Sequence, residues 1–215
     1  MYNNIDKYVT EFQRTLERTE VQTGDGTSLE FNDGAELAIG IIQAQTSLGK
    51  KLIFIGNGGS AGIASHMAID FWKNGGMRAV AFNDGALLTC IGNDYGYAHV
   101  FGKPIAMFAE SGDILIAISS SGKSENILRG VESGRATGCK VITLSGFSCD
   151  NPLRRLGDLN FYVPVSHYGF VEVGHQMLLH AVLDIIIERK MVSSINSGKR
   201  RAGMAALSLD PTLSS

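Results

Sequence analysis

Two segments rich in glycine and serine carry the strongest chemical signal in the sequence. The first, Gly56-Asn57-Gly58-Gly59-Ser60, follows a short apolar run at 52–55. The second, Ser119-Ser120-Ser121-Gly122-Lys123-Ser124, follows an apolar run at 114–118. Each segment leads from an expected strand into an expected helix, where free backbone N–H groups attract anions. The serine hydroxyls make each segment a neutral cradle that suits a phosphate group.

The two segments together are more informative than either one alone. Neither matches the Gly-x-Gly-x-x-Gly pattern of dinucleotide sites or the Gly-x-x-x-x-Gly-Lys-Ser/Thr pattern of nucleoside triphosphate sites. A plain strand-to-helix turn with a serine cap is the alternative interpretation of the first segment. Ligands of parallel sheets bind outside the carboxyl ends of the strands, where both segments are expected to lie. We therefore predict one phosphate site built from both turns.

Histidine and carboxylate side chains could act on the rest of such a ligand. His66 and Asp70 are four residues apart in the helix expected after the first turn, so both face the same side. The same spacing lets two side chains bind one metal ion. In the last long helix, Glu172 and His180 lie roughly 80° apart around the axis and can share a face. His175 lies roughly 140° from His180, so we expect it on another helix face or at an interface.

Two helices are expected to precede these segments. Apolar residues at helical spacing predict a first helix that ends before the Thr23-Gly24-Asp25-Gly26 break. A second helix can be capped by Asn32 or Asp33. Together the two helices should form an arm over about residues 1–48, ahead of the main domain.

The rest of the chain alternates short apolar runs with helical segments. The runs lack alternation of polar and apolar residues, so both faces of the sheet should be buried between helices. This order predicts a doubly wound α/β fold. A closing helix is expected from about Phe170 to about Lys190, followed by a loose tail at 196–215 that is rich in Ser, Gly and Ala. The five runs expected to be strands are 52–55, 79–82, 114–118, 141–144 and 161–165.

The composition excludes several classes of function. The 215 residues carry a formal net charge of −2 and a pI near 6.2, so no basic footprint for nucleic acid is present. No uninterrupted apolar run approaches the roughly 20 residues that span a bilayer, and the first residues do not resemble a signal peptide. The three cysteines fit no zinc module. We expect a cytoplasmic protein with reduced thiols, without nucleic acid or membrane as a partner.

Several segments resemble the sugar isomerase (SIS) family. They are GNGGSA at 56–61 with ASH at 64–66, GNDYGY at 92–97, ISSSGKS at 118–124 and VITLSG at 141–146. Within that family they look most like the phosphoheptose isomerases, which interconvert sedoheptulose 7-phosphate and a heptose 7-phosphate. The resemblance covers nearly the whole chain. It implies a three-layer αβα sandwich with a five-stranded parallel sheet, as a single SIS domain at 1–195 with a flexible tail at 196–215.

The resemblance also implies a set of substrate contacts and an assembly. Serine hydroxyls would hold the phosphate, while Asn57 and Asp94 would face the sugar. The family forms homotetramers with sites at the subunit interfaces, and its small-molecule ligand is a sugar phosphate. The full set of implied substrate contacts is Asn57, Gly58, Ser60, Asn93, Asp94, Ser119, Ser120, Ser121, Ser124 and Glu172.

The resemblance further implies a metal centre made by His66, Asp70, Glu172 and His180. Many family members bind zinc there, and cobalt, nickel or manganese suit the same ligands. Asp70 stands where better-known members have Glu, and Glu172 stands where they have Gln. As catalytic residues we assign Asp70 as the base and His180 as the acid/base at the sugar oxygens. If the metal binds Asp70, the base is His180 or Glu172 instead.

The function expected from this resemblance is isomerisation of D-sedoheptulose 7-phosphate to D-glycero-D-manno-heptose 7-phosphate, feeding nucleotide-heptose synthesis. The departures at Asp70 and Glu172 leave an isomerase of another sugar phosphate as an alternative. A third reading is a non-catalytic SIS protein that binds a sugar phosphate or a replication initiator. Such a binding protein would not need two histidines and two carboxylates together, so the sequence favours an enzyme.

Overall fold

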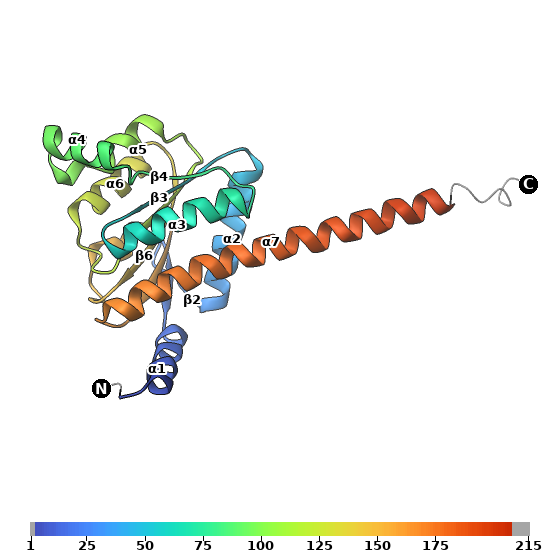
Figure 1. The fold of residues 1–215 in the computed structure, drawn as a ribbon, viewed down its shortest axis with the longest axis horizontal. Helices are drawn as coiled ribbons and strands as arrows, with labels where there is room; N and C mark the ends of the chain where they lie inside the picture. The colour runs from blue at the N-terminus through green and yellow to red at the C-terminus, as the bar shows by residue number, and fades with distance from the viewer. Residues whose placement is uncertain (1–2, 208–215) are drawn as a thin grey trace, which may run out of the picture.

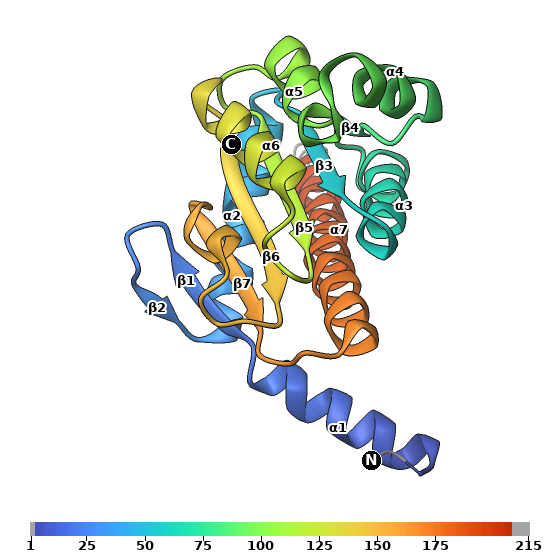
Figure 2. The same cartoon turned by 90° about the vertical axis from the view of Figure 1, so that its left-hand side faces the viewer.

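The chain folds around a single mixed β-sheet (Figures 1 and 2). The structure is a computed structural model that describes residues 3–207, with side chains described up to residue 194. The strand order is β2-β1-β7-β6-β5-β3-β4. The strands are β1 (Glu20–Thr23), β2 (Ser28–Leu29), β3 (Leu52–Gly56), β4 (Ala79–Ala81), β5 (Ile114–Ser119), β6 (Lys140–Gly146) and β7 (Leu159–Val163).

The five strands from β3 to β7 confirm the predicted parallel sheet. They pair in parallel, with Ile53 opposite Leu115 and Leu115 opposite Val141. The strand count of the sheet is the one difference, because β1 and β2 form an antiparallel hairpin that extends the β7 edge. The sequence indicates only a break after the first helix at Thr23–Gly26. It is instead the turn of a hairpin whose strands are too short to show a periodic pattern.

Helices cover both faces of the sheet and make the predicted three layers. One face packs against α2 (Phe31–Ser47), α3 (Gly59–Lys73) and α7 (Tyr168–Leu207). The other packs against α5 (Gly102–Phe108) and α6 (Glu125–Ala136). Successive strand residues point to opposite faces, so Phe54 belongs to the first core while Ile53 and Ile55 belong to the second. Both faces of the sheet are therefore buried, as the sequence predicted, and Thr143 and Asn160 add buried polar side chains to β6 and β7.

The first and last helices meet at the start of α7. Helix α1 (Ile5–Glu17) extends from the body of the domain, as Figure 2 shows. The rings of Tyr8 and Phe12 pack on Phe170 with centroid distances of 4.8 and 5.7 Å. This aromatic contact fixes α1 against the segment where α7 begins.

Helix α7 is longer than we expected. It was predicted to end near Lys190, and a loose tail was expected from residue 196, but the helix continues to Leu207. The added segment contains Lys, Arg, Ala, Met and Leu, which favour helix strongly enough to offset two glycines. Part of the expected tail, 208–215, lies outside the described residues.

Within the described residues, one segment has the length and composition of a membrane-spanning helix. It is Tyr168–Ser194 in α7, with a mean hydropathy of 1.5 in its most apolar window. Half of that window is buried inside the domain, where Leu179, Leu183 and Ile186 join the core under the sheet. We therefore interpret α7 as a core helix.

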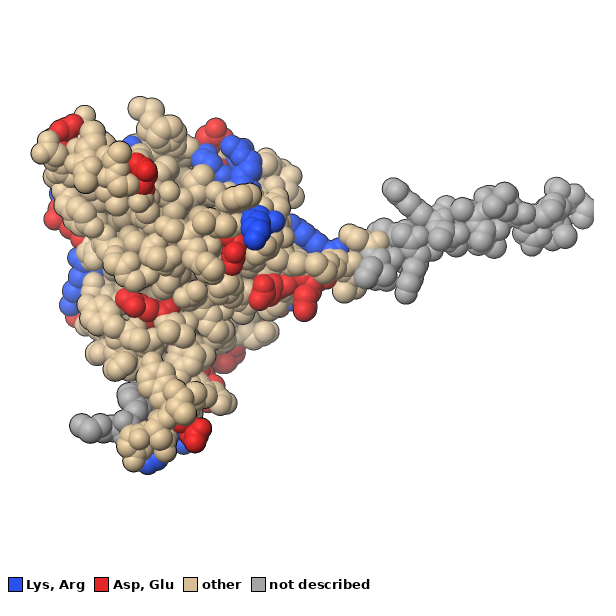
Figure 3. All heavy atoms as spheres, in the orientation of Figure 1, with Lys and Arg blue, Asp and Glu red and all other residues tan. Residues whose placement is uncertain are grey.

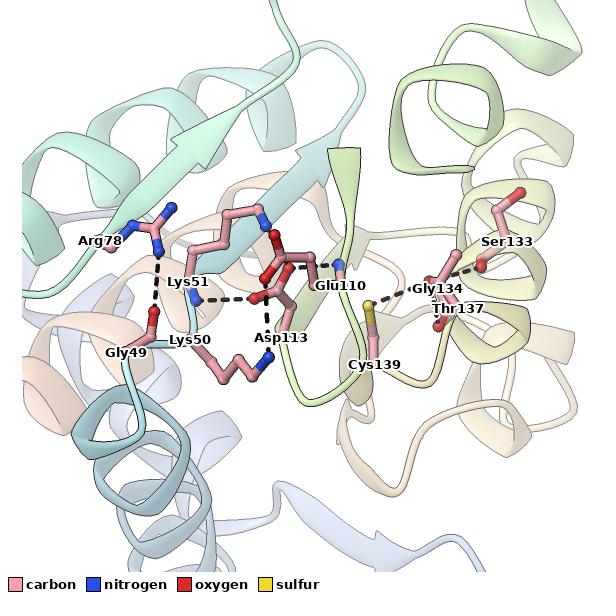
Figure 4. A network of polar contacts seen from close by, with 10 residues as sticks. All are labelled: Gly49, Lys50, Lys51, Arg78, Glu110, Asp113, Ser133, Gly134, Thr137 and Cys139. Atoms are coloured by element: carbon pink, nitrogen blue, oxygen red, sulfur yellow. Dashed lines mark hydrogen bonds and ion pairs between the residues drawn. The ribbon is translucent and has the colours of Figure 1, made fainter. Parts of the chain in front are cut away.

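A polar network lies at the amino ends of β3 and β5 (Figure 4). The Lys51 ammonium and backbone N–H, and the backbone N–H of Glu110, all donate to the buried Asp113 carboxylate. Burial alone would raise the pKa of Asp113, but these donors outweigh it and hold the pKa below its usual range.

All three cysteines are free thiols. Cys139 is buried near this network, whereas Cys90 and Cys149 are exposed.

Candidate active site

The two glycine- and serine-rich turns meet in one cavity at the carboxyl ends of β3 and β5. The cavity has a volume of about 250 Å³. Its lining comes from both turns and from the first turns of α7, which begins beside them in Figure 1. The lining residues are Asn57, Gly58, Gly59, Ser60, Ser119, Ser120, Ser121, Ser124, Tyr168 and Glu172.

The turn between β3 and α3 needs glycine for steric reasons. Gly58, the N-cap of α3, has φ 54° and ψ −123°, a conformation that L side chains rarely adopt. At Gly56, a Cβ atom would lie 2.4 Å from the carbonyl oxygen of Ser60. This tight turn places the first N–H groups of α3 at the cavity, and such groups favour an anion.

The serine turn after β5 supplies hydroxyl groups. Ser119 and Ser120 are buried, with exposed fractions of 5% and 6%. The Ser120 hydroxyl has no hydrogen-bond partner, although it is buried and its residue lines the cavity. A buried hydroxyl without a partner costs free energy, so this group is poised to bond to a ligand.

Asn57 is held by a network that sequence analysis missed. Its amide nitrogen donates to Asn126 Oδ1 at 2.9 Å, and Asn126 Nδ2 donates to Asn57 Oδ1 at 2.8 Å. The Tyr97 hydroxyl donates to the same Asn57 oxygen at 3.0 Å. Asn126 is buried in the first turn of α6. The pair therefore ties the glycine-rich turn after β3 to α6, the helix that follows the serine turn.

Two of the implied substrate contacts lie elsewhere in this chain. Asn93 and Asp94 are exposed near the end of α4 (Gly85–Tyr95) and do not line the cavity. Asn93 Nδ2 donates to Asp94 Oδ1 at 2.9 Å. A hydrogen bond to Asp94 raises the pKa of the neighbouring Cys90 thiol. Only Tyr97, three residues beyond Asp94, connects this segment to the cavity through Asn57.

His66, Asp70 and His180 form a compact cluster between α3 and α7. The Nε2 atoms of His66 and His180 are 3.2 Å apart, and His66 Nε2 lies 3.3 Å from Asp70 Oδ2. One donor atom from each residue lies within 4.8 Å of the others. Two ligand atoms bonded to one tetrahedral zinc at roughly 2.0–2.1 Å lie roughly 3.3–3.4 Å apart. The cluster therefore fits a divalent metal with three protein ligands.

Glu172, the fourth expected metal ligand, lies in the cavity instead of in this cluster. Its carboxylate faces the start of α3, so closely that a Cβ atom at Gly59 would lie 2.5 Å from Oε2. The cluster of possible metal ligands contains His66, Asp70 and His180 without Glu172. Glu172 thus places a negative charge beside the N-terminal turn of α3, among the serine hydroxyls.

His175 is buried on the side of α7 that packs against β6. Its Nε2–H donates to the carbonyl of Ser145 at 3.1 Å, and its Nδ1 atom has no partner. Burial lowers the pKa of His175 to about 4, although the bond to Ser145 opposes this shift. The side chain is therefore neutral near pH 7 and does not join His180, as its helical spacing predicted.

Two helices each contribute to the cavity and to the cluster. Helix α3 carries Ser60 at the cavity and His66 six residues later, a rise of roughly 9 Å along the axis. Helix α7 carries Glu172 at the cavity and His180 eight residues later, roughly 12 Å along. The arrangement can hold a phosphate at one end and expose an extended polyol chain to acid–base groups at the other.

Tyr168 is a further lining residue that the sequence did not single out. Its ring stacks edge-on against Phe147, with centroids 4.8 Å apart. Phe147 has φ 59°, and it is the one residue other than glycine with positive φ in the described part of the chain. Strained backbone of this kind often occurs at ligand sites, but it leaves no mark in the sequence.

Comparison with known families places this arrangement in context. The sequence profile of the SIS domain matches residues 7–146, which is more than half of the chain. A phosphoheptose isomerase of Nitratiruptor sp. is 33% identical over 194 residues, covering 87% of this chain and 99% of that protein. A phosphoheptose isomerase of Serratia proteamaculans is 32% identical over 193 residues, covering 83% and 98%.

Solved structures give the same result. The phosphoheptose isomerase GmhA of Neisseria gonorrhoeae superposes with a TM-score of 0.73 at 28% identity, covering 84% of this chain and 95% of that chain. A phosphoheptose isomerase of Francisella tularensis gives a TM-score of 0.71 at 26% identity, covering 87% and 100%.

Proposed function

Since this chain belongs to the SIS-domain family, in its phosphoheptose isomerase branch, and is an isomerase of sugar phosphates, we propose that its substrate is D-sedoheptulose 7-phosphate. The product is D-glycero-D-manno-heptose 7-phosphate, a precursor for nucleotide-heptose synthesis. One observation carries the proposal: α3 and α7 each contribute both to the lining of the serine-lined cavity and to the His66–Asp70–His180 cluster.

The phosphate is held in the cavity by backbone N–H groups and serine hydroxyls. The unpartnered Ser120 hydroxyl and the N-terminus of α3 supply donors to its oxygens. Asn57 supports the turn through its hydrogen bonds to Asn126. Its side chain reaches the sugar only if those two hydrogen bonds break. Holding the phosphate in this way fixes the far end of the chain and aligns the reacting carbons with the cluster.

The reaction moves a proton between C1 and C2 of the open-chain sugar. Asp70 removes the proton from C1 of the ketose, which leaves an enediol, and returns it to C2 to give the aldose. His180 moves the accompanying proton between the O1 and O2 atoms. The carboxylate of Asp70 lies 3.8 Å from His180 Nδ1, so both groups can reach neighbouring atoms of one substrate.

A divalent metal, with zinc as the first candidate, fits the three donor atoms of His66, Asp70 and His180. When bound, the metal supplies a Lewis acid that polarises the sugar carbonyl. These three residues would hold the metal, while Glu172 lies in the serine-lined cavity outside this set. If the metal takes Asp70, the proton transfer at carbon falls to Glu172 or His180.

The active form is proposed to be a homotetramer with sites at subunit interfaces. Exposed apolar side chains lie on the outer faces of α3 and α7 near the cluster: Ile69, Trp72 and Val173 are 49%, 54% and 49% exposed. Figure 3 shows few charged side chains over the same region. Burying such a patch favours association. A neighbouring subunit could then bring its exposed Asn93 and Asp94 toward the cavity. We propose a cytoplasmic location for this assembly.

A different sugar phosphate is the alternative substrate, and one specific feature favours it. The carboxylate of Glu172 occupies the cavity where better-known members of the family have glutamine. A charged group at that position changes which sugar hydroxyls can be bound. The isomerase relatives disfavour a purely sugar-binding or initiator-binding protein.

The test is turnover of sedoheptulose 7-phosphate by the purified, metal-loaded protein, followed by separation of the ketose and aldose phosphates. We expect conversion by the parent protein, and loss of at least a hundredfold in rate for Asp70→Ala and His180→Ala, in line with roughly 10²–10⁴ for a general acid or base. Full rate in both folded variants would overturn the assignment. Turnover of another sugar phosphate alone would favour the alternative substrate.

A further inference from the structure

A second polar cavity lies at the amino ends of β3 and β4, at the opposite end of the strands from the serine-lined cavity. Its volume is about 410 Å³. It is bounded by the end of α2, by the segments that enter β3 and β4, and by the part of α7 that leaves the domain. The lining residues are Gln43, Thr46, Ser47, Gly49, Lys50, Gly76, Met77, Arg78 and Lys190.

The charged residues that line this second cavity are all cations. Its charged lining residues are Lys50, Arg78 and Lys190, and no carboxylate lines it. This concentration of cations occurs in a chain whose formal net charge is −2. Figure 3 shows blue side chains near the end of α3 and the point where α7 leaves the body, with red side chains beside them. Converging cations in a concave site attract anions.

Most of the donors on these cations are free to bind a ligand. One Arg78 N–H donates to the carbonyl of Gly49 at 3.0 Å, as Figure 4 shows, and Lys190 Nζ donates to the carbonyl of Gly75 at 3.0 Å. These bonds tie the two side chains to the loops that follow α2 and α3, and they use one donor on each side chain. Arginine has five N–H donors and lysine three, so further donors remain.

Lys50 lacks such a bond to any backbone carbonyl that the structure describes, so support of a loop does not explain its place at the cavity. Its ammonium lies 3.7 Å from Glu110, whose side chain is 65% exposed. Such an exposed ion pair contributes little and can be given up when a stronger anion binds. The bonds of Arg78 and Lys190 to backbone carbonyls hold those two side chains in place, while Lys50 can turn toward a ligand.

A neighbouring cavity extends the site. It has a volume of about 460 Å³ and shares Lys190 with the first. Its lining includes the side chains of Asn74, Ile187 and Met191. We propose that the two cavities form a binding site for a small molecule in which a diphosphate is joined to an uncharged body, as in a nucleoside diphosphate. The diphosphate bonds to Lys50, Arg78 and Lys190, and the body packs on Ile187 and Met191.

The test is isothermal titration calorimetry of the full chain in the background of Ser121→Glu, which closes the serine-lined cavity to anions by charge. The probes are inorganic pyrophosphate, orthophosphate and ADP. We expect one pyrophosphate site per chain to persist, with orthophosphate weaker and ADP at least as tight as pyrophosphate. Adding Lys50→Gln should weaken pyrophosphate roughly tenfold, a change of about 1.4 kcal/mol. Adding Arg78→Gln should weaken it further.

The matched control is Lys7→Gln, which removes one exposed positive charge on α1, far along the chain from the cavity. We expect it to leave pyrophosphate affinity unchanged. The proposal is overturned if Ser121→Glu removes all pyrophosphate binding, or if Lys7→Gln weakens binding as much as Lys50→Gln. It is also overturned if ADP binds more weakly than orthophosphate. Because no step measures catalysis, these outcomes are independent of the proposed isomerase activity.

Discussion

The side-chain amides of Asn57 and Asn126 form a reciprocal hydrogen-bonded pair across 69 positions of sequence, with N–O distances of 2.9 and 2.8 Å. Each amide uses one N–H and its oxygen in the pair. The Tyr97 hydroxyl adds a third bond to the Asn57 oxygen. The pair joins the turn after β3 to the helix after the serine turn. It therefore fixes the width of the cavity where we propose that the phosphate binds.

Replacement of Asn126 by Ala should widen that cavity and leave the Asn57 amide without its partner. A lost hydrogen bond to a buried group costs about 1–3 kcal/mol, so we expect the affinity for inorganic phosphate to fall by roughly fivefold to a hundredfold. Calorimetry with inorganic phosphate measures this directly. In a double-mutant cycle, Asn57→Ala and Asn126→Ala should be strongly non-additive. Additive effects would show that the two amides act separately. Tyr97→Phe removes one bond to Asn57 and should cause a smaller loss of phosphate affinity.

The cluster of His66, Asp70 and His180 should bind one divalent metal per chain. Metal analysis of the purified protein should find this metal, and His66→Ala or Asp70→Ala should reduce the metal content to a small fraction. His99→Ala removes a histidine outside the cluster and should leave the content unchanged. Metal-free parent protein, or metal that survives in both His66→Ala and Asp70→Ala, would contradict the ligand assignment.

Glu172→Gln should strengthen the binding of inorganic phosphate. The Glu172 carboxylate lies in the serine-lined cavity, where it repels a bound phosphate, and glutamine keeps its size without the charge. We expect a gain of roughly tenfold in affinity, equivalent to about 1.4 kcal/mol. Glu188→Gln, on an exposed part of the same helix, is the control. Weaker phosphate binding in Glu172→Gln would instead mean that Glu172 serves the ligand through a hydrogen bond or a metal.

His175 should make the fold sensitive to mild acid. Its pKa is about 4 in the folded chain and about 6.5 when unfolded, so between these values the unfolded chain binds the extra proton. Stability is therefore fully present above pH 6.5 and falls as the pH drops toward 4, by on the order of 3 kcal/mol. Urea unfolding at several pH values measures the loss. His175→Gln keeps a donor for Ser145 without titrating, so its stability should change less over this window.

Much of the fold could be predicted because its signals are local. Continuous apolar runs such as Ile114–Ile118 mark strands buried on both faces, and the glycines at 56–59 mark the turn into α3. The hairpin of β1 and β2 was missed because four and two residues are too few for a periodic pattern. The end of α7 was missed because composition does not separate a polar helix from a tail.

The site was predictable only where spacing along one element decides it. His66 and Asp70 are four residues apart and therefore lie on one face of α3. The serines of the second turn are contiguous in sequence. Tyr97 and Asn126 were missed because their contacts with Asn57 span 40 and 69 residues. The separation of Glu172 from the histidine cluster depends on how α7 crosses α3, which helical angles within α7 do not determine.

The most direct test of the central claim is proton NMR of the metal-loaded protein with sedoheptulose 7-phosphate in deuterium oxide. If the cavity holds the phosphate while Asp70 or a neighbouring group moves the proton, an aldose phosphate should appear with deuterium at C2. The remaining ketose should gain deuterium at C1. Asp70→Ala should abolish both signals. A parent protein that binds the sugar phosphate but forms no aldose phosphate and incorporates no deuterium at C1 or C2 would contradict the account.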